Sequence, residues 1–597
     1  MTGRSIVIKG IIIGCGLLLA ARLMFIQLLD PNYQRAAEDN VIQKIIEYPY
    51  RGLITDRDNH LLVFNSPVYD LLVVPNEVSI PDTARFLQML EITQEEFDEA
   101  MFKAKKFSRK LPSVLLNQIA NEHLARIQGD LLEYEGFFIQ PRTVREYEYP
   151  GMSHVLGYVG EVSRRQILND TTDYYRGGDY IGISGVEKEY EKDLRGERGV
   201  SYRLVDVDRV AKGKFRDGDY DTLPRPGQNV QLTLDLELQR YAEKLMEGKI
   251  GSVVAIEPKT GEILAFVSSP DYNPSLLSGK KLGKNYGELE RDSLKPLFNR
   301  ALQAMYPPGS MFKTVQSLIA LQEGVVDADQ QIYCKGDLIG DLAPVGYYDI
   351  KRAITYSSNN YFFIAFRRTM LQNEDPNMFV DSRIGLSKWR DYVTRFGLGN
   401  RLGIDIPNEQ PGFVPTVDYY DRVYGTRRWK FSNIYSLSIG QGELLVTPLQ
   451  MANLGALLAN RGYYYTPHLM KRVGNETSLG FERNEVGIDS IHYRSVFEGM
   501  EQVVTIGSGR RAYVKDLQIC GKTSTVENPG YDHSGFMGFA PLDDPKIAIA
   551  VYVENAGWGG RAAAATAGLV IEKYLRGEVS RQWMENYVLK GDFHDPK

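Results

Sequence analysis

The feature of this sequence that most limits its fold is an apolar run near the N-terminus, from Gly10 to Leu29. Only Arg22 and Gln27 interrupt its 20 residues, and as an α-helix the run would be about 30 Å long, enough to cross a bilayer. Arg4 and Lys9 precede it, and positive residues on a short leading segment keep that segment in the cytoplasm. We therefore expect a single-pass anchor in the cytoplasmic (inner) membrane, with the bulk of the chain outside it, in the periplasm.

Two other interpretations of this run are a cleaved signal peptide and a lipoprotein signal that ends at Cys15. Apolar residues continue past both candidate cleavage sites, which favours an uncleaved helix. Gly10 and Gly14 have the spacing of helices that pack closely in membranes, a weak indication of a membrane partner.

Composition excludes several classes of function. The chain has 597 residues, enough for several domains, and 70 Lys and Arg against 76 Asp and Glu give a net charge of −6. No general attraction for polyanions follows, so we expect no nucleic-acid partner. Three cysteines and seven scattered histidines lack the spacing of a disulfide framework or a metal site, so we expect no metal and no cofactor.

The order of sequence patterns predicts an α+β protein. A cluster of Gly and Pro at 218–227 marks a domain boundary near residue 226. Beyond it, the strand-like segments 251–258 and 262–269 are joined by a turn too short for a helical crossover, which predicts an antiparallel sheet packed by helices. The predicted parts are an anchor (1–30), an N-terminal domain (31–226) with an inserted helical lobe (about 76–145), a second domain (227–575) and a C-terminal tail (576–597).

Two segments of the N-terminal domain carry local predictions. Polar and apolar residues alternate from Arg51 to Asn65 around an Asp-Arg-Asp-Asn turn, which predicts a β-hairpin. The charged segment from Gly185 to Gly199 predicts a helix with a solvated face.

Ser310 and Lys313 are the first candidates for chemistry. Pro307, Pro308 and Gly309 make a tight entry, and an apolar helical period follows. A spacing of three places hydroxyl and amine on one helix face, where a neutral amine can activate the hydroxyl as a nucleophile.

The Ser-x-x-Lys pattern alone is weak, because it arises about once or twice by chance in a chain of this length. It recurs at Ser278 and Lys281, among Gly and Lys without a following apolar period, so we interpret that copy as an exposed loop.

Two further polar clusters give Ser310 a context. Ser357 and Asn359 lie 47 residues beyond it, ahead of an aromatic helix. Lys522 lies 165 residues beyond Ser357 and begins the run Lys522, Thr523, Ser524 and Thr525 on a predicted strand. Singly, these residues would more often be helix caps or strand ends. Three such clusters in this order are far less probable by chance.

Ser-x-x-Lys, Ser-x-Asn and Lys-Thr-Gly in this order are the active-site motifs of penicillin-binding proteins and serine β-lactamases, which the chain resembles. Position 524 is Ser where that family usually has Gly, so Ser524 is expected to restrict or tilt the acyl donor. An intact Lys-Thr-Gly at Lys259, Thr260 and Gly261 precedes Ser310 and reads as a turn between two strands, so we reject it as the third motif.

Longer segments, from "YRGLITDRDNHLLVFN" to "GFMGFAP", resemble class B penicillin-binding proteins over nearly the whole chain. The segment "FNRALQAMYPPGSMFK" is most similar to the penicillin-binding protein 2 branch, which serves cell elongation. The resemblance implies an elongated pedestal with a helical head, followed by a β-lactamase-like transpeptidase domain. It also implies stem peptides of peptidoglycan as substrates, β-lactams as covalent inhibitors, and a SEDS glycosyltransferase (RodA) and an MreC-type scaffold as partners.

The resemblance assigns a role to each motif residue. Ser310 forms the acyl-enzyme with a D-alanyl-D-alanine stem peptide, and Lys313 is the base, with its pKa lowered by the nearby cation Lys522. Ser357 relays a proton to the leaving group, and Asn359 contacts the donor amide. Substrate binding falls to the strand: the Thr523 and Thr525 hydroxyls hold the donor carboxylate with Lys522, and the backbone N–H groups of Ser310 and Thr525 form an oxyanion hole.

Several alternatives remain open at this point. The chain could be the division-specific transpeptidase, a β-lactam sensor, or a scaffold with weak catalysis, and a D,D-carboxypeptidase side activity is compatible with the same motifs. A secreted β-lactamase would need an activated water, and the anchor argues against it. His533 is interpreted as a loop-ordering residue, Cys520 as a small strand residue, and Cys334, without a neighbouring His, as no zinc ligand.

Overall fold

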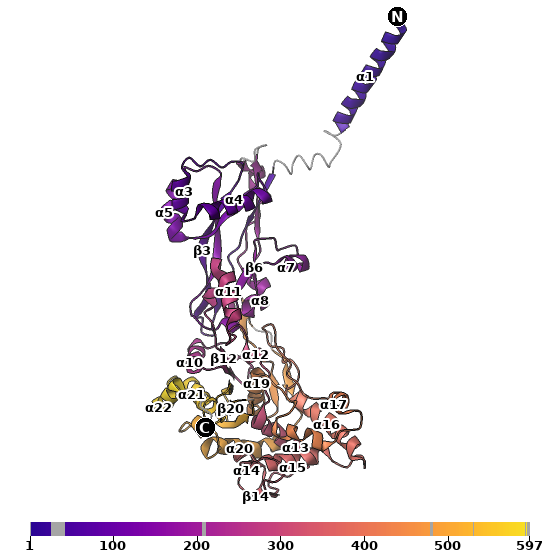
Figure 1. Ribbon diagram of the computed structural model, residues 1–597, viewed down its shortest axis with the longest axis vertical. Helices are drawn as coiled ribbons and strands as arrows, with labels where there is room; N and C mark the ends of the chain where they lie inside the picture. The colour runs from indigo at the N-terminus through magenta and orange to yellow at the C-terminus, as the bar shows by residue number, and fades with distance from the viewer. Residues whose placement is uncertain are drawn as a thin grey trace. The chain divides into compact units, whose positions relative to one another are not determined.

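The computed structural model describes residues 2–25, 42–205, 211–477, 481–528, 530–591 and 593. Helix α1 (Thr2–Met24) leads the chain (Figure 1), and its segment Val7–Met24 is long and apolar enough to cross a membrane. The large apolar side chains of that segment are exposed, as a helix facing lipid requires. Residues 26–29 of the predicted run lie outside the described residues.

The rest of the chain folds into two compact units. The first unit takes in residues up to Gly52 together with Asn65–Val144 and Arg195–Gln228, and the second takes in Leu53–Phe64, Arg145–Leu194 and Asn229–Lys597. Both units therefore contain segments from the N-terminal third of the sequence.

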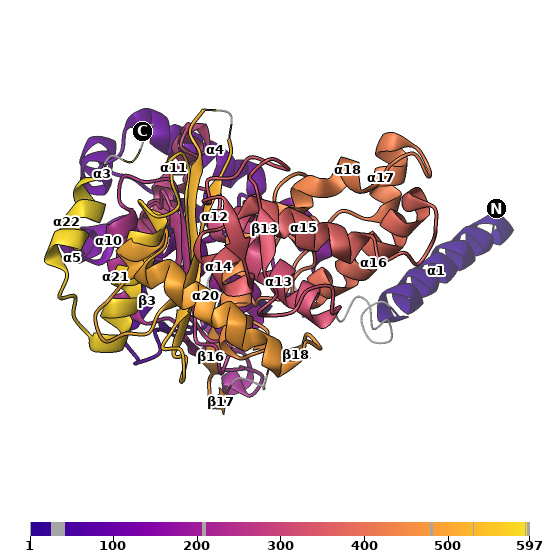
Figure 2. The same cartoon turned by 90° about the horizontal axis from the view of Figure 1, so that it is seen from below.

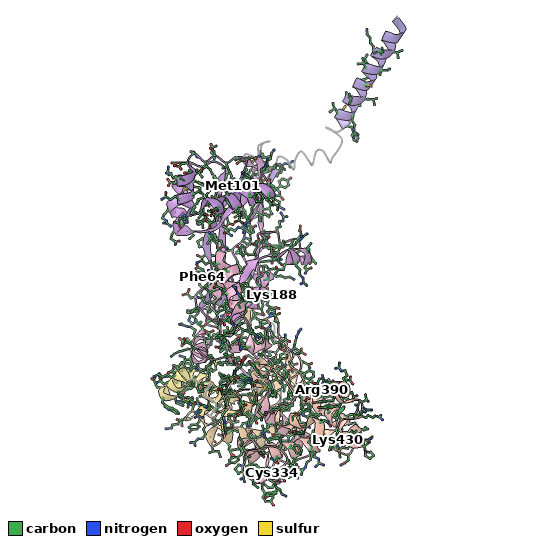
Figure 3. All side chains as sticks on the ribbon, viewed as in Figure 1. Phe64, Met101, Lys188, Cys334, Arg390 and Lys430 are labelled. Atoms are coloured by element: carbon green, nitrogen blue, oxygen red, sulfur yellow. The ribbon has the colours of Figure 1, made fainter. Side chains whose placement is uncertain are left out.

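The first unit contains an antiparallel sheet of β1 (Ile42–Glu47), β8 (Gly199–Val205) and β9 (Ala211–Lys214). Its helical lobe has its own apolar core, which includes Met101 (Figure 3). The lobe was predicted from helical patterning, and it also contains strand β4, which pairs with the end of β3 (Leu61–Val73). The elements of the lobe are α3 (Thr83–Leu90), α4 (Gln94–Phe107), β4 (Ser113–Ala120), α5 (Asn121–Leu131) and the start of β5 (Phe137–Tyr147).

The predicted hairpin is confirmed in the second unit. Strand β2 (Ile54–Thr55) pairs antiparallel with the start of β3, and the turn between them is held by Asp56, whose carboxylate accepts the backbone N–H groups of Asp58 and His60. Strand β2 also pairs in parallel with β10 (Val230–Leu232). A long-range pairing of this kind joins residues far apart in the sequence into one folded unit.

The prediction of a helix with a solvated face at Gly185–Gly199 is confirmed for Lys188, Glu189 and Lys192, which are exposed, but it is wrong for the rest of the segment. The segment forms two short helices, α8 (Gly185–Glu189) and α9 (Glu191–Leu194), and their acids Glu187 and Glu191 are buried. Glu187 pairs with Arg145 at 2.7 Å between Oε1 and Nε, with 0% and 4% of the two side chains exposed. Charge patterning could not reveal this, because the pairing cation is 42 residues earlier in the sequence.

A five-stranded antiparallel sheet forms the centre of the second unit, in the order β12-β11-β21-β20-β19. Its strands are β11 (Gly251–Ile256), β12 (Ile263–Ser269), β19 (Cys520–Val526), β20 (His533–Ala540) and β21 (Ile547–Val553). The predicted antiparallel pairing of β11 with β12 is confirmed. Strand β19 lies at one edge of this sheet, which leaves one side of its backbone unpaired within the sheet.

Alternate residues of these strands face two helical layers. On β21, Ile547, Ile549 and Val551 pack with α10 (Leu236–Met246), α21 (Ala563–Arg576) and α22 (Gln582–Lys590). The intervening Ala548 and Ala550 pack with α19 (Pro448–Ala459). Figure 2 shows α10, α21 and α22 on one side of the sheet, and α12 (Arg300–Gln303) and the helices within residues 313–395 on the other.

A helical subdomain on the α19 side carries two of the three motifs. It contains α13 (Lys313–Gln322), α14 (Ile350–Thr355), α15 (Asn359–Met370), α16 (Met378–Arg395) and α20 (Tyr493–Thr505). Trp389 is fully buried between Phe312 and Phe366, and its indole N–H donates to Gln316 Oε1 at 3.0 Å. The start of α13 is therefore fixed by packing on all sides.

Removal of the buried carboxylate should show how much the second unit depends on the Arg145–Glu187 pair. We expect Glu187→Ala to lower the free energy of unfolding by about 3 kcal/mol, because Arg145 then stays buried without this partner. Glu485→Ala, which removes an exposed partner of Arg483, should cost under about 1 kcal/mol. Thermal unfolding of the two variants beside the parent tests this, and equal midpoints would contradict it.

Candidate active site

The turn that presents Ser310 is narrow and tightly held. Gly309 has φ +53°, a value that favours glycine, and its N–H donates to the Gly440 carbonyl at 2.8 Å. Ser310 follows in a short 3₁₀ helix, η5 (Gly309–Phe312), and α13 begins at Lys313. Ser310 is half-buried and Lys313 is fully buried. The helix predicted to open at Ser310 therefore opens with a 3₁₀ turn.

The Lys313 amine reaches the second motif. Its Nζ donates to the Ser357 carbonyl at 2.6 Å, to Asn359 Oδ1 at 2.5 Å and to Ser357 Oγ at 3.2 Å. Among the residues that the structure describes, none is hydrogen-bonded to Ser310 Oγ. The amine of Lys313 is thus held by two acceptors of Ser357, in the connection before α15, and by one of Asn359, the first residue of α15.

The third motif closes the cluster. Lys522 Nζ donates to Ser357 Oγ at 2.9 Å and to the Thr523 carbonyl at 3.2 Å. Ser357 Oγ is therefore shared by the amines of Lys313 and Lys522, which come from an α-helix and from the edge strand β19. Lys522 and Lys313, which are 165 and 44 residues from Ser357 in the sequence, therefore meet at the Ser357 hydroxyl.

Burial sets the charge of the two amines. Desolvation lowers the pKa of Lys313 well below 10.5, and the Lys522 cation lowers it further, against a smaller opposing effect of Asp341. Desolvation also lowers the pKa of Lys522 to about 7. The sequence predicted the neighbouring cation as the reason for a neutral Lys313, but burial is the larger cause.

Ser357 occupies an unusual backbone conformation. Its φ is +57°, in the left-handed region that costs a non-glycine residue free energy, and it connects α14 to α15. The next residue, Ser358, is the N-cap of α15, and its Oγ accepts the Tyr361 N–H. The tight connection places the Ser357 hydroxyl and the Asn359 amide side by side on Lys313.

Asp341 holds this connection, and sequence reasoning missed it. Its Oδ2 accepts the Ser358 hydroxyl at 2.8 Å and the Asn360 N–H at 2.9 Å, and its Oδ1 accepts the Ala343 N–H. The Asn359 Nδ2 donates to the carbonyl of Gly340 at 2.5 Å. No sequence pattern marked the loop of Asp341, since the partners that tie it to the second motif, Ser358 and Asn360, come 17 and 19 residues later.

The side chains of β19 alternate in direction. Those of Lys522 and Ser524 face the helical subdomain, where Ser524 Oγ donates to the Pro308 carbonyl at 2.9 Å. The hydroxyls of Thr523 and Thr525 are engaged elsewhere, by Ser508 Oγ at 2.5 Å and by the Gly559 N–H at 3.1 Å. The structure therefore brings Ser310, Lys313, Ser357, Asn359 and Lys522 together and places the two threonines on the opposite face of the same edge strand.

The residues set aside in the sequence also have clear positions. Lys259, Thr260 and Gly261 form the turn between β11 and β12, as predicted, and Lys259 pairs with Asp544 at the surface. Ser278 and Lys281 lie at a 3₁₀ turn, η4 (Gly279–Lys281), before α11 (Leu282–Arg291), a helix that the sequence did not predict.

The single residues weighed in the sequence can also be placed. Cys520 is a buried residue of β19, as predicted. His533 Nδ1 accepts the Asn555 N–H at 3.0 Å, which agrees with its predicted loop-ordering role. Cys334, labelled in Figure 3, ends strand β13 (Ile332–Cys334).

Comparison with known proteins agrees with this arrangement. Residues 251–572 match the family described as the penicillin-binding protein transpeptidase domain, and residues 46–232 match the penicillin-binding protein dimerisation domain. The chain belongs to the class B penicillin-binding proteins. It is 32% identical over 601 residues to an Acinetobacter baumannii protein named peptidoglycan D,D-transpeptidase MrdA, a match that covers 94% of this chain and 86% of that protein.

Solved structures of the family share the fold of this penicillin-binding protein. A complex between penicillin-binding protein PBP2 and MreC from Helicobacter pylori gives a TM-score of 0.73 at 26% identity, covering 90% of this chain and 100% of that chain. A structure described as the coordination of polymerization and crosslinking by a peptidoglycan synthase complex gives 0.70 at 27% identity, covering 97% and 100%.

The two amines predict how reactivity changes with pH. We expect the second-order rate constant for acylation by a penicillin to be high at neutral pH, because Lys313 is a free base well below pH 10.5. It should fall as pH rises through about 7, where Lys522 loses its charge and its attraction for the ligand carboxylate. Acylation rates with a fluorescent penicillin between pH 5 and 10 measure this profile.

The surface variant Lys546→Ala is the control, since Lys546 is exposed and pairs with Asp544, which also pairs with Lys259 at the surface, so the profile should stay unchanged. A rate constant that rises until about pH 10, the ordinary range of a lysine, would contradict the assignment of both shifts.

Proposed function

We propose that this protein is a peptidoglycan D,D-transpeptidase that cross-links stem peptides during cell elongation through an acyl-enzyme on Ser310. The observation that carries the proposal is the hydrogen-bonded cluster of Lys313, Ser357 and Lys522 next to the turn of Ser310. A buried neutral amine one helical turn from a half-buried hydroxyl has the chemistry of a general base beside a nucleophile. The A. baumannii relative carries the name of this activity.

The first half-reaction begins at Ser310. Neutral Lys313 takes the proton of the Ser310 hydroxyl, and the resulting alkoxide attacks the carbonyl between the two D-alanine residues of the donor. The backbone N–H groups of Ser310 and Thr525 stabilise the oxyanion that forms. As the peptide bond breaks, Ser357, which is hydrogen-bonded to both amines, relays the proton from Lys313 to the departing D-alanine nitrogen.

The second half-reaction reverses these proton transfers. An acceptor amine attacks the ester carbonyl, its proton passes through Ser357 to Lys313 and on to Ser310 Oγ, and the new amide is released. Water in place of the amine would give D,D-carboxypeptidase activity as a side reaction. A β-lactam would acylate Ser310 in the same way but keep its leaving group attached, which blocks the acceptor.

The edge strand β19 suits the donor. An extended peptide can add to the unpaired side of an edge strand by backbone hydrogen bonds. We assign the terminal carboxylate of the donor to Lys522 and the donor amide to Asn359. The hydroxyls of Thr523 and Thr525, which are hydrogen-bonded to Ser508 and to the Gly559 N–H on the other face of β19, would join Lys522 at the carboxylate after exchanging those partners. The Asn359 side chain is already fixed by Lys313 and Gly340, so it is pre-organised rather than free to turn.

The anchor and the first unit define the proposed surroundings. Helix α1 would hold the protein in the inner membrane with both units in the periplasm. We propose the N-terminal domain, residues 31–226 with its inserted head at about 76–145, as the region that contacts a SEDS glycosyltransferase (RodA) and an MreC-type scaffold. The support is the H. pylori complex of PBP2 with MreC and the solved peptidoglycan synthase complex.

Other roles receive less support. A division-specific role fits the motifs equally, but solved relatives carry the PBP2 name, as the segment around Ser310 predicts. A pure scaffold would not need the Lys313–Ser357–Lys522 cluster, and a β-lactam sensor would need it for acylation, but the A. baumannii relative is named a transpeptidase and not a sensor. Cross-linking in elongation therefore remains our conclusion.

Mutation of the nucleophile tests the proposal directly. Ser310→Ala should abolish covalent labelling by a fluorescent penicillin, because the other hydroxyls near Lys313 are engaged: Ser317 donates to the Lys313 carbonyl, and Ser357 is held by the amines of Lys313 and Lys522. Ser278→Ala is the matched control, since Ser278 belongs to the other Ser-x-x-Lys and its hydroxyl donates to the Arg145 carbonyl. It should keep full labelling, and retained labelling of Ser310→Ala would refute the assignment.

The membrane topology has its own test. Alkaline phosphatase, which folds only outside the cytoplasm, should be active when fused to the C-terminus of the full chain. Deletion of residues 2–25 removes α1 and should abolish that activity. An inactive full-length fusion would contradict the periplasmic location.

A further inference from the structure

Ser524 stands where the family usually has glycine, and its side chain does not extend into open space. Only 1% of the residue is exposed, and its Oγ donates to the Pro308 carbonyl at 2.9 Å. The two residues are 216 apart in sequence, on β19 and on the turn before the nucleophile. We call this hydrogen bond the Ser524–Pro308 latch.

Two glycines make room for the serine. A Cβ atom on Gly309 would lie 2.2 Å from Ser524 Oγ, so the hydroxyl occupies the space beside the glycine that precedes Ser310. Gly535 is paired directly with Ser524 across β19 and β20, and a Cβ atom there would lie 3.3 Å from Ser524 Cβ. The serine is therefore packed against the nucleophile turn on one side and against β20 on the other.

The latch joins the neighbours of two functionally linked groups. In the proposed mechanism the oxyanion hole consists of the N–H groups of Ser310 and Thr525. Pro308 lies two residues before Ser310, and Ser524 lies immediately before Thr525. A hydrogen bond between those neighbours fixes the separation of the two donors more firmly than packing against a glycine would.

Other contacts restrain the same turn but not its distance to residue 525. Gly309 donates to the Gly440 carbonyl at 2.8 Å, and the Tyr552 hydroxyl donates to the Pro307 carbonyl at 3.4 Å. Neither of these partners belongs to β19. Ser524 thus supplies the side-chain hydrogen bond from β19 to the turn, and Val526 of the same strand packs beside Gly309 without a hydrogen bond.

We infer that Ser524 is a positioning residue that sets the geometry of the oxyanion hole through the Ser524–Pro308 latch, and that it does so without contacting the donor. The inference rests on the proposed function, and it replaces the expectation that Ser524 restricts or tilts the donor. A donor aligned along the edge of β19 meets backbone groups there, while the Ser524 hydroxyl stays engaged with Pro308.

Acylation kinetics separate positioning from binding. With the full chain and a fluorescent penicillin, Ser524→Ala should lower the first-order acylation rate constant roughly tenfold, because a less rigid hole stabilises the oxyanion less. The dissociation constant of the non-covalent complex should change by less than about twofold, since the latch does not touch the ligand. Ser524→Gly, which restores the usual family residue, should behave like Ser524→Ala.

Ser524→Thr provides the rescue, because it keeps the hydroxyl, and the side chain nearest Gly535 is the flexible end of Met311, which can shift to admit the added methyl group. It should stay within about threefold of the parent rate constant. Ser252→Ala is the matched control for loss of a buried strand hydroxyl, since Ser252 lies on β11 and is fully buried. It should leave both constants unchanged.

Two outcomes would overturn the inference. Parent-like acylation by Ser524→Ala would show that the latch does not position the hole, and a weaker non-covalent complex with an unchanged rate constant would make Ser524 a substrate contact. Hydrogen exchange of residues 309–312 adds a readout independent of catalysis and should be faster in Ser524→Ala, and unchanged exchange would also overturn it. If the parent protein itself is not acylated, the proposed function fails. Hydrogen exchange of residues 309–312 then remains as the test of whether the Ser524–Pro308 latch restrains the turn.

Discussion

Two fully buried lysine amines share one serine hydroxyl, and at that distance the two amines cannot both keep a positive charge. Protonating the buried Lys522 costs roughly 5 kcal/mol relative to water, from the fall of its pKa from 10.5 to about 7. A second cation at Lys313 would add repulsion to desolvation, so the proton of Lys313 is the one released. Burial thus produces a neutral base next to a charged lysine that can hold an anion.

The surrounding fold holds Lys313, Ser357 and Lys522 in fixed positions. The aromatic packing of Trp389 holds the start of α13, and Asp341 holds the connection that forces Ser357 into its left-handed conformation. On the other side, β19 is the edge of a sheet whose two faces are covered by helices, so Lys522 approaches from a stable platform. Each amine therefore comes from a different layer of the second unit, and neither can relax without unfolding that layer.

The sequence predicted those parts that local patterns determine. The antiparallel pairing of β11 with β12, the hairpin after the anchor and the strand of Lys522 each follow from alternation and turn residues. The order of Ser310, Ser357 and Lys522, together with the family resemblance, predicted the cluster without any coordinates. The anchor followed from the length of one apolar run.

The parts that depend on distant partners could not be predicted. No local sequence feature distinguishes Glu187 from a solvated acid, because its buried ion pair is with Arg145, which lies in another segment of the chain. Asp341 gains its role from hydrogen bonds to residues of the next helix, and the direction of Ser524 follows from the space beside Gly309. Burial as the main cause of the pKa of Lys313 likewise needs the packed structure.

The most direct test of this account is the titration of Lys313 itself. Lysine labelled with ¹³C at Cε reports the charge of its amine by NMR, and the Lys313→Arg variant assigns the resonance in the full chain in detergent. The account predicts that the Lys313 signal titrates well below pH 10.5, or stays that of a neutral amine down to the pH of unfolding. A Lys313 signal that titrates near pH 10.5, like that of an exposed lysine, would contradict it.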